Sequence, residues 1–209
     1  MRRLSVSLAL AGTFAAASAG AQGTPAAPPP AGVVASSMAT EVVRIMSRYL
    51  EGRWIPQAAG LAGPSRISIS YGQPHARGRT IVGSVVPYDS VWRIGANEAT
   101  ELTTDLDITV GGAHIPHGAY TLFALPTKNG WQLIVSKETR QWGTDYNPAM
   151  DLVRIPLRAR TLTEPLESLS IYLVPTLDAK GAAPTMPHGT LKIVWDRTEL
   201  STDWSVDAK

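Results

Sequence analysis

Cysteine is absent from all 209 residues of the sequence. Its absence excludes thiol catalysis, metal sites built on thiolates and any framework of disulfide bonds. Three motifs of common enzymes are also missing: the Gly-x-Ser-x-Gly turn of serine hydrolases, the glycine-rich phosphate loop and the His-Glu-x-x-His helix of metalloproteases. The fold must therefore be stabilised by packing, and no cofactor is predicted.

Long hydrophobic runs are missing too. The apolar run near the N-terminus, LSVSLALAGTFAAA at residues 4–17, is shorter than the ~20 residues that a membrane-spanning helix needs. It follows Arg2 and Arg3 and precedes two small-x-small cleavage sites, Ala17-Ser18-Ala19 and Ala19-Gly20-Ala21. This arrangement is typical of a secretory signal peptide, here at residues 1–21. We therefore expect an exported protein, periplasmic or extracellular, that is not an integral membrane protein.

An excess of one charge is lacking once this segment is removed. The 19 Lys and Arg residues lose Arg2 and Arg3, which leaves 17 basic residues against 17 Asp and Glu. A nucleic-acid-binding protein needs a concentrated basic face, so we expect no nucleic-acid partner. The composition does not indicate an oligomeric state.

The segments that follow the signal peptide differ in character. Residues 22–37, QGTPAAPPPAGVVASS, are rich in proline and alanine and read as an extended linker. Residues 38–54 place apolar side chains at intervals of three to four, which predicts an amphipathic helix that packs on the main domain. The apolar positions of this helix are Val42, Ile45, Met46, Tyr49 and Leu50.

The remainder, residues 62–209, consists of short runs rich in β-branched and aromatic residues, bounded by glycine, proline, asparagine or aspartate. No helical crossovers separate the runs, so a parallel sheet is disfavoured. The pattern predicts an all-β fold, an antiparallel β-sandwich or jelly-roll-like barrel. The predicted strands cover residues 66–71, 102–112, 119–126, 131–137, 152–159, 166–174, 190–196 and 199–206.

Ordered motifs within these runs carry a family resemblance. Ser65-Arg66 opens the first strand, and then come YGQPHARGRTIVGSVVPYDSVWRIGANEAT, IPHGAYTLFALP, WQLIVSK and QWGTDYNPAMDLVRIPL. Through these motifs, residues from about 64 to 205 resemble the family catalogued as domain of unknown function 2911, of exported bacterial proteins. The resemblance implies an exported β-rich domain. It implies no agreed activity, so no catalytic residue is carried over.

The segment VWRIGANEAT, residues 91–100, concentrates polar chemistry between two predicted strands. In a structural interpretation, Arg93 forms a partly buried ion pair with Glu98 or another carboxylate, and Asn97 caps the turn. In a functional interpretation, the segment is a pocket floor: Trp92 stacks on a ligand, Arg93 and Asn97 donate hydrogen bonds, and Glu98 accepts one or acts as a base.

Three other loops carry candidate residues. His75, Arg77 and Arg79 lie in QPHARGRT, which is either a solvated turn or an anion clamp with a titratable histidine. His114 and His117 are weak candidates for a metal site, because Pro116 and Gly118 already explain that segment as a loop. In the third loop, QWGTDYNP at residues 141–148, Trp142 and Tyr146 could stack on sugar rings or cover one end of the core.

These motifs support three functions. The first is binding of a small polar ligand or an envelope glycan at one end of the sheets, by the 73–79 and 91–100 segments and the 141–147 loop. The second is a hydrolase that uses Glu98 as base or nucleophile and His75 as acid, with a second carboxylate within ~5–10 Å of Glu98. The third is a structural or interaction module of the cell envelope, in which the polar corner serves only the fold.

Overall fold

The computed structural model describes the backbone of residues 36–50, 53–56, 65–178 and 186–207, and the side chains of 36–46, 65–178 and 186–207. The predicted signal peptide and most of the predicted linker lie outside these residues. The described elements are β1 (Ser37–Ile45), β2 (Ser47–Leu50), β3 (Arg53–Pro56), β4 (Ser65–Gln73), β5 (Thr100–Thr104), β6 (Ile108–Val110), β7 (Ala113–Ile115), β8 (Gly118–Thr127), β9 (Gly130–Ser136), a 3-10 turn (Pro148–Met150), β10 (Asp151–Pro175) and β11 (His188–Val206).

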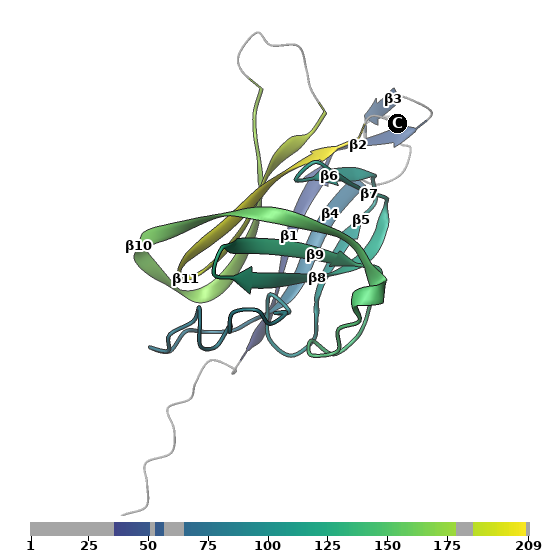
Figure 1. The fold of residues 1–209 in the computed structure, drawn as a ribbon. Helices are drawn as coiled ribbons and strands as arrows, with labels where there is room; N and C mark the ends of the chain where they lie inside the picture. Colours follow the sequence, from purple (N-terminus) through teal and green to yellow (C-terminus); the bar gives the residue numbers. More distant parts are fainter. Residues whose placement is uncertain (1–35, 51–52, 57–64, 179–185, 208–209) are drawn as a thin grey trace, which may run out of the picture. The chain divides into compact units, whose positions relative to one another are not determined.

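Nine of these strands form one antiparallel sheet in the order β1-β4-β5-β8-β9-β10-β11-β6-β7, and β2 pairs with β3 as a separate hairpin (Figure 1). The prediction of an antiparallel all-β fold is therefore confirmed. The finer prediction of a sandwich or jelly-roll-like barrel is not confirmed, because the hydrogen-bonded order is open between its end strands, β1 and β7.

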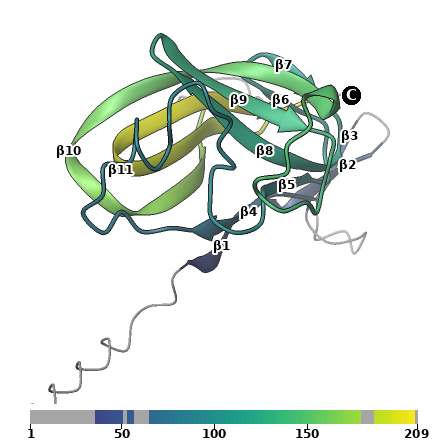
Figure 2. The same ribbon diagram turned by 60° about the horizontal axis from the view of Figure 1, so that its bottom comes forward.

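The 25-residue strand β10 connects the two parts of the sheet. Its first residues, 151–157, pair with β9, and residues 158–175 pair with β11. The register between β10 and β11 shifts after Thr161 and again after Leu166, and such irregularities bend and twist a strand. Figures 1 and 2 show β10 running past β9 and then curving round beside β11. The two predicted strands 152–159 and 166–174 are thus one bent strand.

The predicted helix over residues 38–54 is wrong. Residues 37–45 form β1, which pairs with β4 over all nine residues, and β2 and β3 follow. Thr40, Val42, Val43 and Ile45 are β-branched, which favours a strand. The alternation of polar and apolar residues that is typical of a strand is interrupted in the sequence, because Glu41 occupies an inward-facing position between Ala39 and Val43. Its carboxylate has a partner there, since its Oε1 accepts a hydrogen bond from the Leu173 N–H (3.3 Å).

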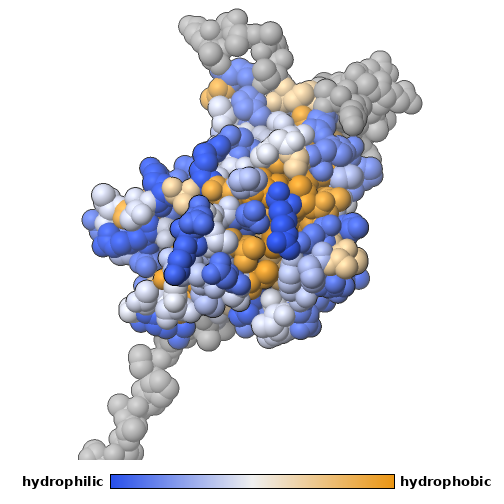
Figure 3. Space-filling view, in the orientation of Figure 1, coloured by the Kyte–Doolittle hydropathy of each residue, from blue (hydrophilic) through white to orange (hydrophobic). Residues whose placement is uncertain are grey.

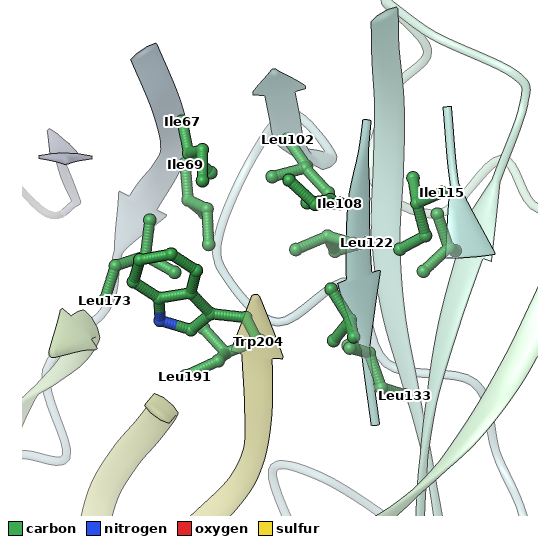
Figure 4. A pocket seen from close by; sticks show the side chains of 12 residues that line it. Ile67, Ile69, Leu102, Ile108, Ile115, Leu122, Leu133, Leu173, Leu191 and Trp204 are labelled. Atoms are coloured by element: carbon green, nitrogen blue, oxygen red, sulfur yellow. The ribbon is translucent and has the colours of Figure 1, made fainter. Parts of the chain in front are cut away.

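The apolar core lies between the two parts of the sheet. One group of buried side chains comes from β4, β5, β8 and β9 and the other from β6, β7, β10 and β11. Figure 4 shows members of both groups pointing into one space, with Trp204 of β11 beside Leu173 and Leu191. That space holds about 20 Å³, room for roughly one water molecule, so the core is a packed interior. Trp131, Trp195 and Trp204 are buried in the core, whereas the Trp54 side chain lies outside the described residues.

A row of polar contacts joins β4 and the neighbouring loop to the far part of β10. The backbone pairs at an isolated bridge between His75 and Ser168, flanked by the Leu169 N–H donating to the Pro74 carbonyl at 2.9 Å. Further along, the free edge of β10 is capped by side chains instead: Tyr71 Oη accepts from the Ile171 N–H (3.1 Å). Burial raises the pKa of Tyr71, so the hydroxyl stays protonated.

The described surface is mixed in polarity. Figure 3 shows hydrophobic residues gathered near the centre of one face with hydrophilic residues around them. No helix among the described residues is long and apolar enough to span a membrane. The exposed large hydrophobic residues are Met38, Val42, Met46, Val85, Tyr88, Trp142, Tyr172, Val174 and Leu177.

We expect Tyr71→Phe to destabilise the fold by about 1–3 kcal/mol, because it leaves the buried Ile171 N–H without its acceptor. Urea unfolding of the variant measures the change. Tyr88→Phe is the control, since Tyr88 is exposed and its hydroxyl makes no hydrogen bond among the described residues. Equal stability of the Tyr71 variant and the parent would show that side-chain capping of β10 contributes nothing.

Candidate functional site

The 91–100 segment turns sharply before it enters β5. Trp92 extends the sheet beside β8, since its N–H donates to the Ala124 carbonyl (2.8 Å) and its carbonyl accepts in return (2.7 Å). The turn that follows places Ile94 and Asn97 at positive φ. Gly95 packs against Gly72, and a Cβ at Gly95 would lie 3.1 Å from the Gly72 carbonyl oxygen. The turn is closed by the buried Thr100 hydroxyl, which donates to the Ile94 carbonyl at 2.8 Å.

A second loop, residues 140–143, lies directly against this turn. Glu98 and Trp142 form an isolated β-bridge, and the Gly143 N–H donates to the Asn97 carbonyl (3.1 Å). Glycine is required at 143, because a Cβ there would lie 2.0 Å from Arg93 Cδ and 2.6 Å from the Asn97 carbonyl oxygen. The structure therefore brings together two of the three segments that the sequence analysis placed in one site.

The two loops border a polar pocket of about 450 Å³ on the outer face of the sheet. Its floor follows the strand register, since Ser70 pairs with Glu101 and Glu101 pairs with Thr121 across β4, β5 and β8. Residues directly opposite on paired strands lie on the same face. The pocket is lined by Met38, Ser70, Glu98, Ala99, Glu101, Thr121, Arg140, Gln141 and Trp142.

The pocket presents hydrogen-bonding groups of both kinds. The Thr121 hydroxyl donates to Gln141 Oε1 (3.2 Å), which fixes the orientation of the Gln141 amide. The Nε2 of that amide is buried and has no hydrogen-bond partner among the described residues. A buried donor without an acceptor is costly unless a ligand or water satisfies it. Glu98 and Glu101 supply carboxylate acceptors, and Trp142 keeps 53% of its surface exposed beside them.

Arg93 does not line this pocket. Its stem packs against Gly143, and its Nε is buried without a hydrogen-bond partner among the described residues. Burial lowers the pKa of Arg93. In the described part of the chain Arg93 forms no ion pair with Glu98 or with another carboxylate. The ion pair that the structural interpretation of this segment expected is therefore absent there. Asn97 is exposed, and its backbone carbonyl holds the Gly143 loop.

Trp92 and Tyr146 are engaged in packing. The Trp92 ring stacks on Trp195 with centroids 6.0 Å apart and meets Trp131 edge-on at 6.4 Å. Tyr146 packs edge-on against Phe123 (5.0 Å), and its hydroxyl donates to the Asp151 carboxylate at 2.8 Å. Burial, followed by the Asp151 hydrogen bond, raises the pKa of Tyr146. Neither aromatic ring lines the pocket.

The 73–79 segment lies against β10 and contributes nothing to the pocket lining. His75 Nδ1 contacts Ser168 Oγ at 2.7 Å. The Arg77 N–H donates to Glu167 Oε1 (2.7 Å), and the Arg79 guanidinium donates to the carbonyls of Ala76 and His75 (3.1 and 2.7 Å). The hydrogen bonds of Arg79 thus stabilise the turn in which Arg79 itself lies.

His114 and His117 each face a carboxylate. His114 Nδ1 lies 2.6 Å from Asp207 Oδ2, and His117 Nδ1 lies 2.8 Å from Asp107 Oδ1. In the described part of the chain, no group of three or more His, Cys, Asp or Glu residues is arranged to hold a metal ion. The first contact joins β7 to the segment after β11, and the second joins the two segments that flank the β6–β7 hairpin.

Sequence reasoning missed most of the pocket floor. Ser70 and Thr121 lie in predicted strands and Glu101 in no predicted element, although RISISY places its serines at positions that alternate with apolar ones and Glu101 directly precedes Leu102. Those outward positions could have been combined only with knowledge of which strands are neighbours. Arg140 and Gln141 stand immediately before Trp142 and were overlooked in favour of the aromatic residue.

Comparison with known proteins gives one match. The pattern of the family described as "Protein of unknown function (DUF2911)" matches residues 57–203, more than half of the chain. This confirms the family resemblance noted from the sequence motifs. Among curated proteins and among solved structures, nothing matches significantly.

The Asp107–His117 contact predicts a pH-dependent contribution to stability. The backbone N–H of His117, and then its ring, lower the pKa of Asp107 below its usual value of about 3.9. A folded-state pKa below the unfolded-state pKa stabilises the fold. This contribution is fully present above the unfolded-state pKa and is lost as the pH falls through the folded-state pKa. We expect Asp107→Asn to flatten the acid side of the stability profile, measured by urea unfolding between neutral and strongly acidic pH. An unchanged profile in the variant would contradict this assignment.

Proposed function

Because the chain belongs to the DUF2911 family, whose description assigns no activity, we propose a function from the site itself: the protein binds a small polar ligand, an envelope glycan by class. The pocket bordered by the Glu98 turn and the Trp142 loop is the binding site. The observation that carries the proposal is a polar pocket of about 450 Å³ with an exposed tryptophan at its edge and an unpaired amide donor in its wall.

The size and the tryptophan favour a sugar. Small-molecule sites commonly enclose about 300–1,000 Å³ and use a few placed polar groups to orient the ligand. Trp142 offers a flat apolar surface on which the C–H face of a pyranose ring can stack. Trp142 is also held in position, because its backbone bridges Glu98 and the following Gly143 is bound to Asn97.

The polar groups match hydroxyl groups in both directions. Glu98 and Glu101 accept hydrogen bonds from sugar hydroxyls, and Gln141 Nε2 donates to a hydroxyl or ring oxygen. Arg140 also lines the pocket and adds further donors. A neutral glycan can form hydrogen bonds with all of these groups, whereas a strongly anionic ligand would face two carboxylates.

The predicted signal peptide supports this choice of ligand. Export through residues 1–21 would deliver the β-domain to the periplasm or the outside of the cell, where glycans are abundant. Arg77, Arg79 and Trp92, which the sequence analysis placed in the site, have no part in the proposed binding.

We expect Trp142→Ala to weaken binding of neutral oligosaccharides about fivefold, because loss of a stacking ring costs about 1 kcal/mol. Isothermal titration calorimetry of the chain against a panel of oligosaccharides measures the affinity. Tyr172→Ala is the control, since Tyr172 is an aromatic residue 40% exposed on β10 and outside the pocket. Equal loss in both variants, or no binding by the parent to any member of the panel, would refute the proposal and favour the structural module.

A hydrolase is the second candidate, and one observation favours it. Two carboxylates, Glu98 and Glu101, line the same pocket. Glycoside hydrolysis uses such a pair, one as acid and the other as base or nucleophile. His75 has no place in this version, because it contacts Ser168 of β10. Asp105, Asp107 and Asp145 do not line the pocket either, so none of them can supply the second carboxylate there.

Release of reducing ends from oligosaccharides separates the enzyme from the binding module. If the protein is a glycosidase, Glu98→Gln and Glu101→Gln should each lower the rate by about 10²–10⁴-fold. Asp145→Asn, on the same loop as Trp142 but outside the pocket, should leave it unchanged. Binding without release of reducing ends would rule out the hydrolase and leave the binding function intact.

A further inference from the structure

The end strand β1 has one hydrogen-bonded neighbour, β4, and its other edge pairs with no strand of the described residues. An open edge presents unpaired N–H and C=O groups that can pair with another chain. Natural sheets usually protect such edges with lysine, proline or a bulge. β1 contains neither residue and pairs with β4 in unbroken register, and Arg44 is its one cation.

The outward face of this strand is also apolar at regular intervals. Met38 and Met46, the residue that directly follows β1, are each 60% exposed, and Val42 midway between them is 39% exposed. Thr40 and Arg44 occupy the exposed positions between these residues. The exposed row therefore reads Met, Thr, Val, Arg, Met, with Val42 at its centre.

We infer that β1 pairs antiparallel with β1 of a second copy of this chain, about a two-fold axis at Val42. In this register Val42 faces the partner's Val42, and Met38 faces the partner's Met46. Thr40 faces the partner's Arg44, so apolar residues meet apolar residues and no like charges meet. A contact about a two-fold axis uses the same surface on both copies and closes the assembly at two chains.

Neighbouring registers are less favourable. A shift by one residue would place the exposed row of one copy on the same face as the inward-facing row of the other, because side chains alternate along a strand. A shift by two residues would set Arg44 opposite the partner's Met38 in one direction, and opposite the partner's Val42 in the other. Among these registers, the one centred on Val42 keeps Met38, Val42 and Met46 each opposite an apolar side chain.

The proposed pairing of two β1 strands also involves a residue of the candidate site. Met38 lines the polar pocket, and in the paired strands it lies opposite the partner's Met46. The second copy would thus extend the apolar rim of the pocket beyond β1. The inference itself does not depend on the proposed ligand.

Disulfide trapping tests the register directly, because the chain has no cysteine of its own. Opposite residues of an antiparallel pair have Cα atoms about 4.5–5.5 Å apart, within the range of a disulfide. Under mild oxidation, Val42→Cys should give a covalent dimer on a non-reducing gel. Val174→Cys should not, although Val174 is a valine on β10 with a similar exposure of 43%. Met38→Cys should cross-link when mixed with Met46→Cys and not by itself.

A change of mass provides the second measurement. Sedimentation equilibrium of the parent chain should give twice the monomer mass, and Val42→Lys should halve it by setting two lysines opposite each other. Val174→Lys should remain dimeric, and circular dichroism confirms that each variant is folded. A monomeric parent at all concentrations, or cross-linking at 174 equal to that at 42, would overturn the inference. If Val42→Lys does not fold, the disulfide cross-linking of the cysteine variants tests the inference by itself.

Discussion

The structure depends on one strand that belongs to both parts of the sheet. β10 pairs first with β9 and then with β11, so the chain can place the second part of the sheet opposite the first without ending the hydrogen-bonded ladder. The apolar side chains of both parts share one core, and no disulfide is needed to hold them. Where β10 leaves its first neighbour, its backbone needs new partners. Tyr71 and Glu41 supply them from β4 and β1.

The candidate site is a consequence of this arrangement. Because the core occupies the inner face of β4, β5 and β8, polar side chains are left on the outer face, where Ser70, Glu101 and Thr121 stand in a row. The 91–100 turn and the 140–143 loop border the pocket at the end of that row. The contact between them needs glycine at 143 and positive φ at Asn97, so this border of the pocket depends on backbone geometry as much as on side chains.

The sequence predicted the class of fold well because alternation and turn residues are local signals. It did not predict β1, where Glu41 interrupts the apolar alternation for a partner more than a hundred residues away. In the site, Glu98 and Trp142 were predicted from their unusual composition, and the structure places both at the pocket. Glu101 and Gln141 were missed, since a polar strand residue acquires a role only through neighbours that the chain brings in from elsewhere. Trp92 and Tyr146 were assigned to a ligand because a sequence does not show which way an aromatic ring points.

The position of β6 in the sheet has a consequence for the order of assembly. β6 lies between β7 and β11, and its partners on β11 are Trp204, Ser205 and Val206. The β6–β7 hairpin is therefore synthesised long before the strand against which it must lie. Until residues 204–206 have left the ribosome, one side of the core has no cover. The complete sheet can therefore form only after nearly the whole chain has been synthesised.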